Sequence, residues 1–135
     1  MTYRILALIF VTCAAIACGG SSGGSSSTPT NPTPPNNTPP VATTTITITS
    51  AGVNPSRITV APGTRVTFIN NDSRTHEMNS DPHPTHGDCP GIDDVGFMAA
   101  GQTKLTGNLT AVRTCGFHDH NTPDVASLKG QIIVQ

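Results

Sequence analysis

The chain has no tryptophan, one tyrosine and four phenylalanines, and only 11% of its residues are charged. With so few aromatic side chains, a small domain is near the lower limit for an unaided core. Seven basic residues stand against eight acidic ones, and the basic residues form no cluster. This balance argues against a nucleic-acid partner.

The sequence also lacks the patterns of common enzyme classes. It contains no Ser/His/Asp order, no phosphate-binding loop and no paired-carboxylate signature. We therefore expect a binding protein and not an enzyme.

The N-terminal apolar run, residues 5–11, is too short to span a bilayer as a mature helix. It follows Arg4 and ends in small residues, which is typical of a secretory signal. Residues 15–19, Ala-Ile-Ala-Cys-Gly, resemble a bacterial lipobox, although the usual leucine is replaced by Ala15. We predict a lipoprotein signal peptide over residues 1–17 and a lipid on Cys18.

Residues 18–41 combine this cysteine with a Gly/Ser-rich and then Pro-rich segment that has no charge. Such a composition predicts a disordered tether, because it cannot bury enough apolar surface to offset chain entropy. The folded domain is then expected over residues 42–135. We predict a monomer in the bacterial cell envelope, on the periplasmic or outer-membrane and cell-surface side. Its lipid anchor would be its sole membrane contact.

Short alternating runs of β-branched residues dominate the domain. Thr43 to Thr49 alternates cleanly, and strands are also expected over residues 57–60, 64–69, 109–115 and 130–134, with shorter ones over 76–79 and 103–105. About seven such runs indicate an all-β sandwich. The loop over residues 79–97 is long and rich in Pro, Gly, Asp and His, so it is expected to be functional or mobile.

Several segments together resemble the cupredoxin superfamily, which includes plastocyanin and azurin. They are residues 54–72, then His76, residues 101–103, the run Cys115-Gly116-Phe117-His118, and a closing strand. The resemblance covers about residues 46–135. It implies a Greek-key β-sandwich that binds one copper ion and transfers single electrons to an unidentified redox partner protein.

The resemblance also implies a ligand set: the imidazoles of His76 and His118 and the thiolate of Cys115. These are the donors of a trigonal blue-copper site. Leu128 stands where the family usually has an axial methionine, and leucine cannot coordinate a metal. Such a site would be three-coordinate or would use another donor, such as a backbone carbonyl.

Cys89 leaves a second interpretation open. Beyond the lipobox, Cys89 and Cys115 form an even pair, which in an oxidising compartment predicts a disulfide. Copper would then depend on imidazoles, with His83, His86 and His120 as additional candidates. That protein would be a non-redox copper-binding or scavenging module. A metal-free interaction domain is a third possibility.

Residues 116–120, Gly-Phe-His-Asp-His, are also similar to the Gly-Phe-His-x-His motif of copper–zinc superoxide dismutases. Those enzymes take further ligands from a long stretch after the motif. Here no histidine follows His120, so the resemblance does not support that enzyme.

Overall fold

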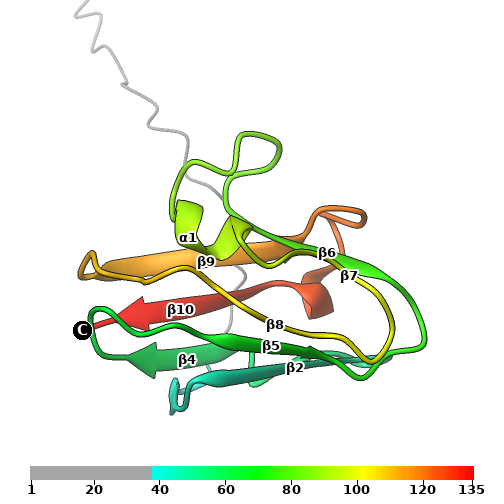
Figure 1. The fold of residues 1–135 in the computed structure, drawn as a ribbon, viewed down its shortest axis with the longest axis horizontal. Coiled ribbons are helices and arrows are strands. Elements are labelled where there is room, and N and C mark those ends of the chain that lie inside the picture. The colour runs from blue at the N-terminus through cyan, green and yellow to red at the C-terminus, as the bar shows by residue number, and fades with distance from the viewer. Residues whose placement is uncertain (1–37) are drawn as a thin grey trace, which may run out of the picture.

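The computed structural model describes residues 38–135, and the predictions for the signal peptide and for lipidation of Cys18 lie outside the described residues. Two β-sheets pack face to face with very little helix (Figure 1). This arrangement confirms the predicted all-β sandwich. Between residues 38 and 135 there are ten strands instead of about seven, because several strands of two or three residues are too short to leave an alternating pattern.

The larger sheet has six strands and carries the histidines of interest. In order across the sheet these are β1 (Val41–Ala42), β4 (Arg57–Val60), β10 (Gly130–Val134), β9 (Arg113–Asp119), β6 (His76–Ser80) and β7 (Gly96–Met98). The smaller sheet consists of β3 (Gly52–Asn54), β2 (Thr45–Thr49), β5 (Thr67–Asn70) and β8 (Thr103–Leu105). A one-turn helix, α1 (Pro90–Asp93), and a 3-10 helix, η1 (Ala126–Leu128), complete the elements.

Side-chain alternation along the strands builds the core. In β2, Ile46 and Ile48 are fully buried while the intervening threonines are partly exposed. Burying an isoleucine side chain stabilises the fold by roughly 1.5–3 kcal/mol. The two sheets meet where the ring of Phe68 packs edge-on against Phe117, with centroids 5.3 Å apart.

One covalent link strengthens this small core. Cys89, just before α1, forms a disulfide with Cys115 of β9, across a sequence separation of 26. Closing a loop of that length stabilises a protein by about 3 kcal/mol. The disulfide therefore partly compensates for the small contribution that aromatic side chains make to this core.

Among the described residues, no helix is long and apolar enough to cross a membrane.

Candidate metal centre

Strand β9 divides its side chains between the two faces of the larger sheet. Phe117 points into the core, where it meets Phe68. Because side chains alternate along a strand, Cys115 and Asp119 share that inner face, while His118 lies on the outer face. Asn79 of β6 is paired with His118, and Asp81 follows beside it. The start of the loop after β6 therefore lies against the outer face of β9.

Four histidines gather on this outer side. His83 and His86 come from the loop between β6 and α1, and His118 and His120 come from the end of β9. One ligand atom from each lies within 4.8 Å of the others. Four nitrogens held tetrahedrally at about 2.0–2.1 Å from a metal are roughly 3.3 Å apart. Small side-chain rotations would thus close the cluster around an ion.

His118 is prepared for a ligand by its hydrogen bonding. Its Nδ1 lies 2.7 Å from Oδ1 of Asp81, so the carboxylate accepts the Nδ1 proton. The lone pair is then on Nε2, which is buried and has no hydrogen-bond partner among the described residues. A buried acceptor without a partner is costly. A carboxylate that orients a ligating imidazole in this way is common beside metals.

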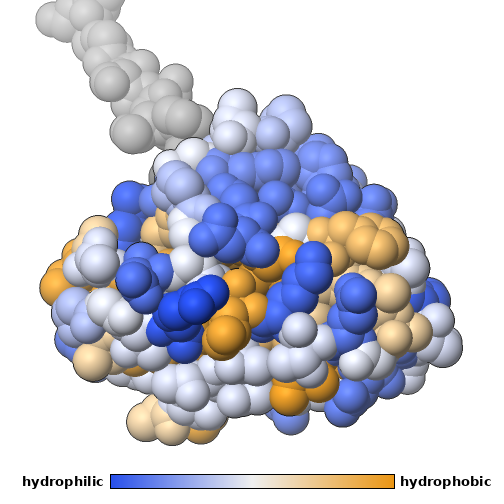
Figure 2. All heavy atoms as spheres, viewed as in Figure 1, coloured by the Kyte–Doolittle hydropathy of each residue, from blue (hydrophilic) through white to orange (hydrophobic). Residues whose placement is uncertain are grey.

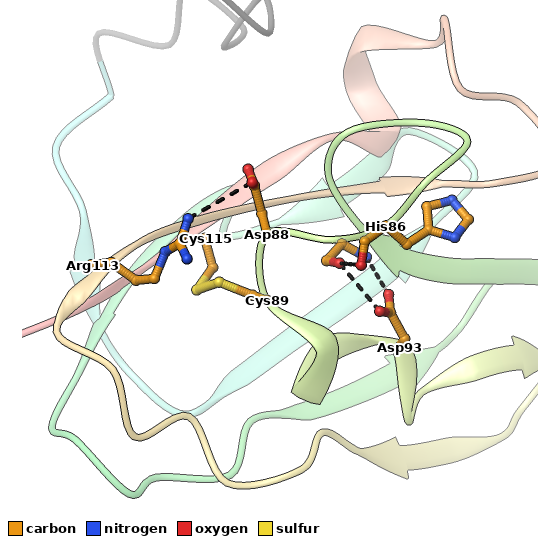
Figure 3. Close-up of a disulfide and its surroundings, with 7 residues drawn as sticks. His86, Asp88, Cys89, Asp93, Arg113 and Cys115 are labelled. Atoms are coloured by element: carbon orange, nitrogen blue, oxygen red, sulfur yellow. Dashed lines mark hydrogen bonds and ion pairs between the residues drawn. A yellow bond between two sulfur atoms is a disulfide. The ribbon is translucent and has the colours of Figure 1, made fainter.

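His86 is held in place from its backbone. Its φ of 50° is a left-handed conformation that residues other than glycine rarely adopt. The conformation is secured because Ser80 Oγ donates to the carbonyl of His86 and the N–H of His86 donates to the carbonyl of Pro82. Asp93 in turn accepts a hydrogen bond from the N–H of Ser80 (Figure 3).

The surroundings of His86 favour its neutral imidazole. Burial, followed by the nearby imidazoles of His118 and His120, lowers the pKa of His86 from its ordinary value of 6.5. Its Nε2 lies 3.1 Å from Nδ1 of His120. A neutral histidine offers a metal a lone pair without first losing a proton. His83 is exposed and completes the cluster from a loop that is hydrophilic in the space-filling view (Figure 2).

The structure does not form the ligand set of His76, Cys115 and His118. The sulfur of Cys115 is bonded to Cys89, so it is not a thiolate. His76 lies an odd number of residues from Asn79, the partner of His118, so His76 is on the opposite face of the sheet. Leu128, at the expected axial position, is a buried apolar side chain of η1.

His76 also has no free ring nitrogen for a metal. Its Nδ1 lies 2.8 Å from Oδ2 of Asp119, and its Nε2 lies 3.2 Å from Oδ2 of Asp72. Burial raises the pKa of Asp119, but hydrogen bonds from His76 and from the N–H groups of Glu77 and Asn121 outweigh it and lower the pKa overall. His76 is thus part of a buried charged network. Sequence reasoning did not identify Asp72, Asp81 and Asp119 as histidine partners. Each lies within five residues of a histidine in the sequence, but Asp81 and Asp119 bond to histidines of distant segments.

Asp72 adds a pH-dependent contribution to this network. A hydrogen bond from the Arg74 guanidinium, assisted by His76 and the N–H of Ser73, lowers the pKa of Asp72 from 3.8 to about 2, although burial opposes the shift. Because the folded pKa lies below the unfolded one, the stabilisation is present above about pH 4 and is lost as the pH falls toward 2.

We therefore expect Asp72→Asn to lower the thermal unfolding midpoint at pH 7, and the deficit relative to the wild type to disappear near pH 2. Unfolding followed by circular dichroism at several pH values measures this. Asp88→Asn serves as the control, because Asp88 is partly exposed and is 3.7 Å from its partner Arg113. A deficit that stayed constant from pH 7 to pH 2 would contradict the assignment.

The described residues thus combine a two-sheet β-sandwich with a cluster of four histidines that could hold a metal ion. No protein-family model and no curated protein sequence matches the chain. Solved cupredoxin structures do match its fold. A purple cupredoxin from Nitrosopumilus maritimus is 16% identical, with a TM-score of 0.54, over 69% of this chain and 100% of that one.

Two further structures give the same result. Amicyanin from Paracoccus versutus is 16% identical, with a TM-score of 0.55, over 73% of this chain and 86% of that one. Plastocyanin from Dryopteris crassirhizoma is 17% identical, with a TM-score of 0.52, over 67% of this chain and 99% of that one. At these identities the comparisons show a cupredoxin-like fold.

Proposed function

We propose that this protein binds one copper ion through His83, His86, His118 and His120. The observation that carries the proposal is the convergence of four ring nitrogens, one of which, Nε2 of His118, is buried without a partner among the described residues. Imidazole suits Zn, Cu, Ni and Fe, and among divalent ions of this series Cu²⁺ binds most tightly to a given site. One amicyanin structure with this fold is described as a Cu(I) form, which supports the choice of copper.

A non-redox role in copper binding or scavenging fits this donor set best. An electron-transfer site that keeps one geometry through Cu(I) and Cu(II) would need the thiolate of Cys115, and that sulfur is in a disulfide. Four imidazoles without a thiolate can hold the ion, but they do not reproduce the blue-copper ligand set. The fold is compatible with electron transfer, but the four-histidine site lacks the thiolate for it. The site therefore supports copper binding better than electron transfer.

The test is a titration of the purified full chain with Cu(II), without reductant. We expect one equivalent to bind, nitrogen hyperfine splitting in the electron paramagnetic resonance spectrum, and only weak visible absorption. Mass measurement after thiol labelling should find Cys89 and Cys115 unlabelled. An intense thiolate-to-copper band, or the absence of stoichiometric binding, would contradict the proposal.

Asp81 is expected to position His118 for the metal. Replacing it by asparagine, which does not supply the carboxylate, should weaken Cu(II) binding by about 10–100-fold while leaving one ion per chain. Competition with a chelator of known affinity measures the change.

Asp88→Asn is the matched control for this prediction. It removes one negative charge from the same loop, but the carboxylate of Asp88 pairs with Arg113, whereas that of Asp81 accepts from His118. Equal losses of affinity in the two variants would mean that net charge, and not the orientation of His118, is responsible.

We also propose that the protein is a lipoprotein of the cell envelope, anchored through Cys18. The lipobox-like sequence and the tether support this proposal, as does the disulfide, because disulfides persist in oxidising compartments. Fatty-acid labelling that disappears in Cys18→Ala would test it.

A further inference from the structure

The loop that carries His83 and His86 is attached to β9 at both of its ends. At its start, the N–H of Asp81 donates to the carbonyl of Gly116, and the Asp81 carboxylate accepts from His118. A Cβ at Gly116 would overlap that carboxylate, so the glycine permits this close approach. At its end, Cys89 is bonded to Cys115, three residues before His118 (Figure 3).

The second attachment depends mainly on the disulfide. Among the described residues, the ion pair beside it joins Asp88 and Arg113 at 3.7 Å, and both side chains are more than 40% exposed. Exposed pairs of this kind contribute little. Other backbone hydrogen bonds near this end, from His86 to Pro82 and from Asp88 to Asp81, lie within the loop. The hydroxyl of Ser80 also donates to the carbonyl of His86 and so joins the loop to β6. These bonds shape the loop and hold it to β6, whereas the disulfide is its covalent link to β9.

We propose that the Cys89–Cys115 disulfide is a redox-controlled staple of the metal centre, and that its reduction releases the metal. The inference rests on the proposed copper binding by the four histidines. With the disulfide intact, His83 and His86 are held against His118 and His120. With it reduced, ordering the loop around an ion costs conformational entropy, so the affinity for the metal falls.

The reductant that fits is a dithiol, and the structure offers it a route. The disulfide forms part of the wall of a surface hollow of about 350 Å³, which Arg113 also lines. A thiolate from the dithiol attacks the sulfur of Cys89, the more exposed of the two cysteines (6% against 2%), and Cys115 leaves as a thiolate that takes up a proton. The second thiol of the reductant then displaces Cys89. Two electrons and two protons pass from the reductant to the protein, and the reductant becomes a disulfide.

The test compares Cu(II) affinity in three forms of the full chain. These are the oxidised wild type, the double variant Cys89→Ser/Cys115→Ser, and the wild type reduced by a phosphine and capped with iodoacetamide. Serine and capped cysteine prevent Cu(II) from reoxidising the pair. We expect both open forms to bind Cu(II) at least about tenfold more weakly, within the roughly 5–150-fold range of typical couplings between sites.

Hydrogen exchange separates release of the loop from loss of the fold. In the open forms we expect faster exchange over residues 81–89, with protection kept in β4 and β10. Unchanged copper affinity in both open forms would overturn the staple and leave the proposed function intact. Global unfolding of the open forms would also overturn it, because the loss of metal would then result from loss of the fold and not from release of the loop. Absence of binding in the oxidised wild type would overturn the copper proposal and this one with it.

Discussion

His118→Ala is expected to weaken Cu(II) binding by more than about 100-fold. The substitution removes the proposed ligand, whose Nε2 is buried, unpartnered among the described residues and oriented by Asp81. Loss of an orienting partner alone typically costs 10–100-fold, and loss of the ligand itself should exceed that. Chelator competition measures the affinity, and electron paramagnetic resonance should show weaker or fewer nitrogen couplings in any residual complex.

His76→Ala is the matched control for that experiment. It deletes the same side chain from the neighbouring strand of the same sheet, but on the opposite face and with both ring nitrogens already bonded to carboxylates. We expect it to keep one Cu(II) ion at close to wild-type affinity, measured at a temperature where it is folded. If His76→Ala lost copper and His118→Ala retained it, the centre would have been assigned to the wrong face of the sheet.

The strands and the identity of the histidine-rich loop could be predicted from sequence, because both depend on local patterns. The alternation of Ile46 and Ile48 with threonines is visible in the chain itself, as is the accumulation of polar and turn residues over 79–97. Five histidines in a small domain also indicated an imidazole site. Four of them form the cluster.

The membership of the cluster could not be predicted from sequence because it depends on register. Whether His76 shares a face with His118 is decided by the pairing of Asn79 with His118, and a shift of one residue would reverse it. Sequence reasoning likewise could not choose between a thiolate and a disulfide, because that depends on the approach of Cys89 to Cys115 through a folded loop. The family resemblance indicated the fold correctly. It also grouped His76 with His118 as ligands, but the strand register places these two side chains on opposite faces of the sheet.

The buried network around His76 leads to the second large effect, on stability. We expect His76→Ala to lower the free energy of unfolding by roughly 1–3 kcal/mol, the cost of leaving a buried hydrogen-bonding group without its partner. His76 lies between the carboxylates of Asp119 and Asp72, whose side chains are each only 3% exposed. Without the imidazole, Asp119 loses a bond to its Oδ2 in a site that water scarcely reaches. Chemical denaturation of the metal-free protein measures the change.

His118→Ala tests the origin of that instability, because the two variants delete the same side chain. The Asp81 carboxylate that it would leave without its imidazole is 15% exposed, so water can partly replace the lost hydrogen bond. The loss of stability in metal-free His118→Ala should therefore be smaller than in His76→Ala. Equal losses would mean that both substitutions destabilise the protein by leaving a cavity where the imidazole was, and not by leaving a buried carboxylate without its partner. A larger loss for His76→Ala, with copper binding retained, would separate the two faces of the sheet into one that stabilises the fold and one that holds the ion.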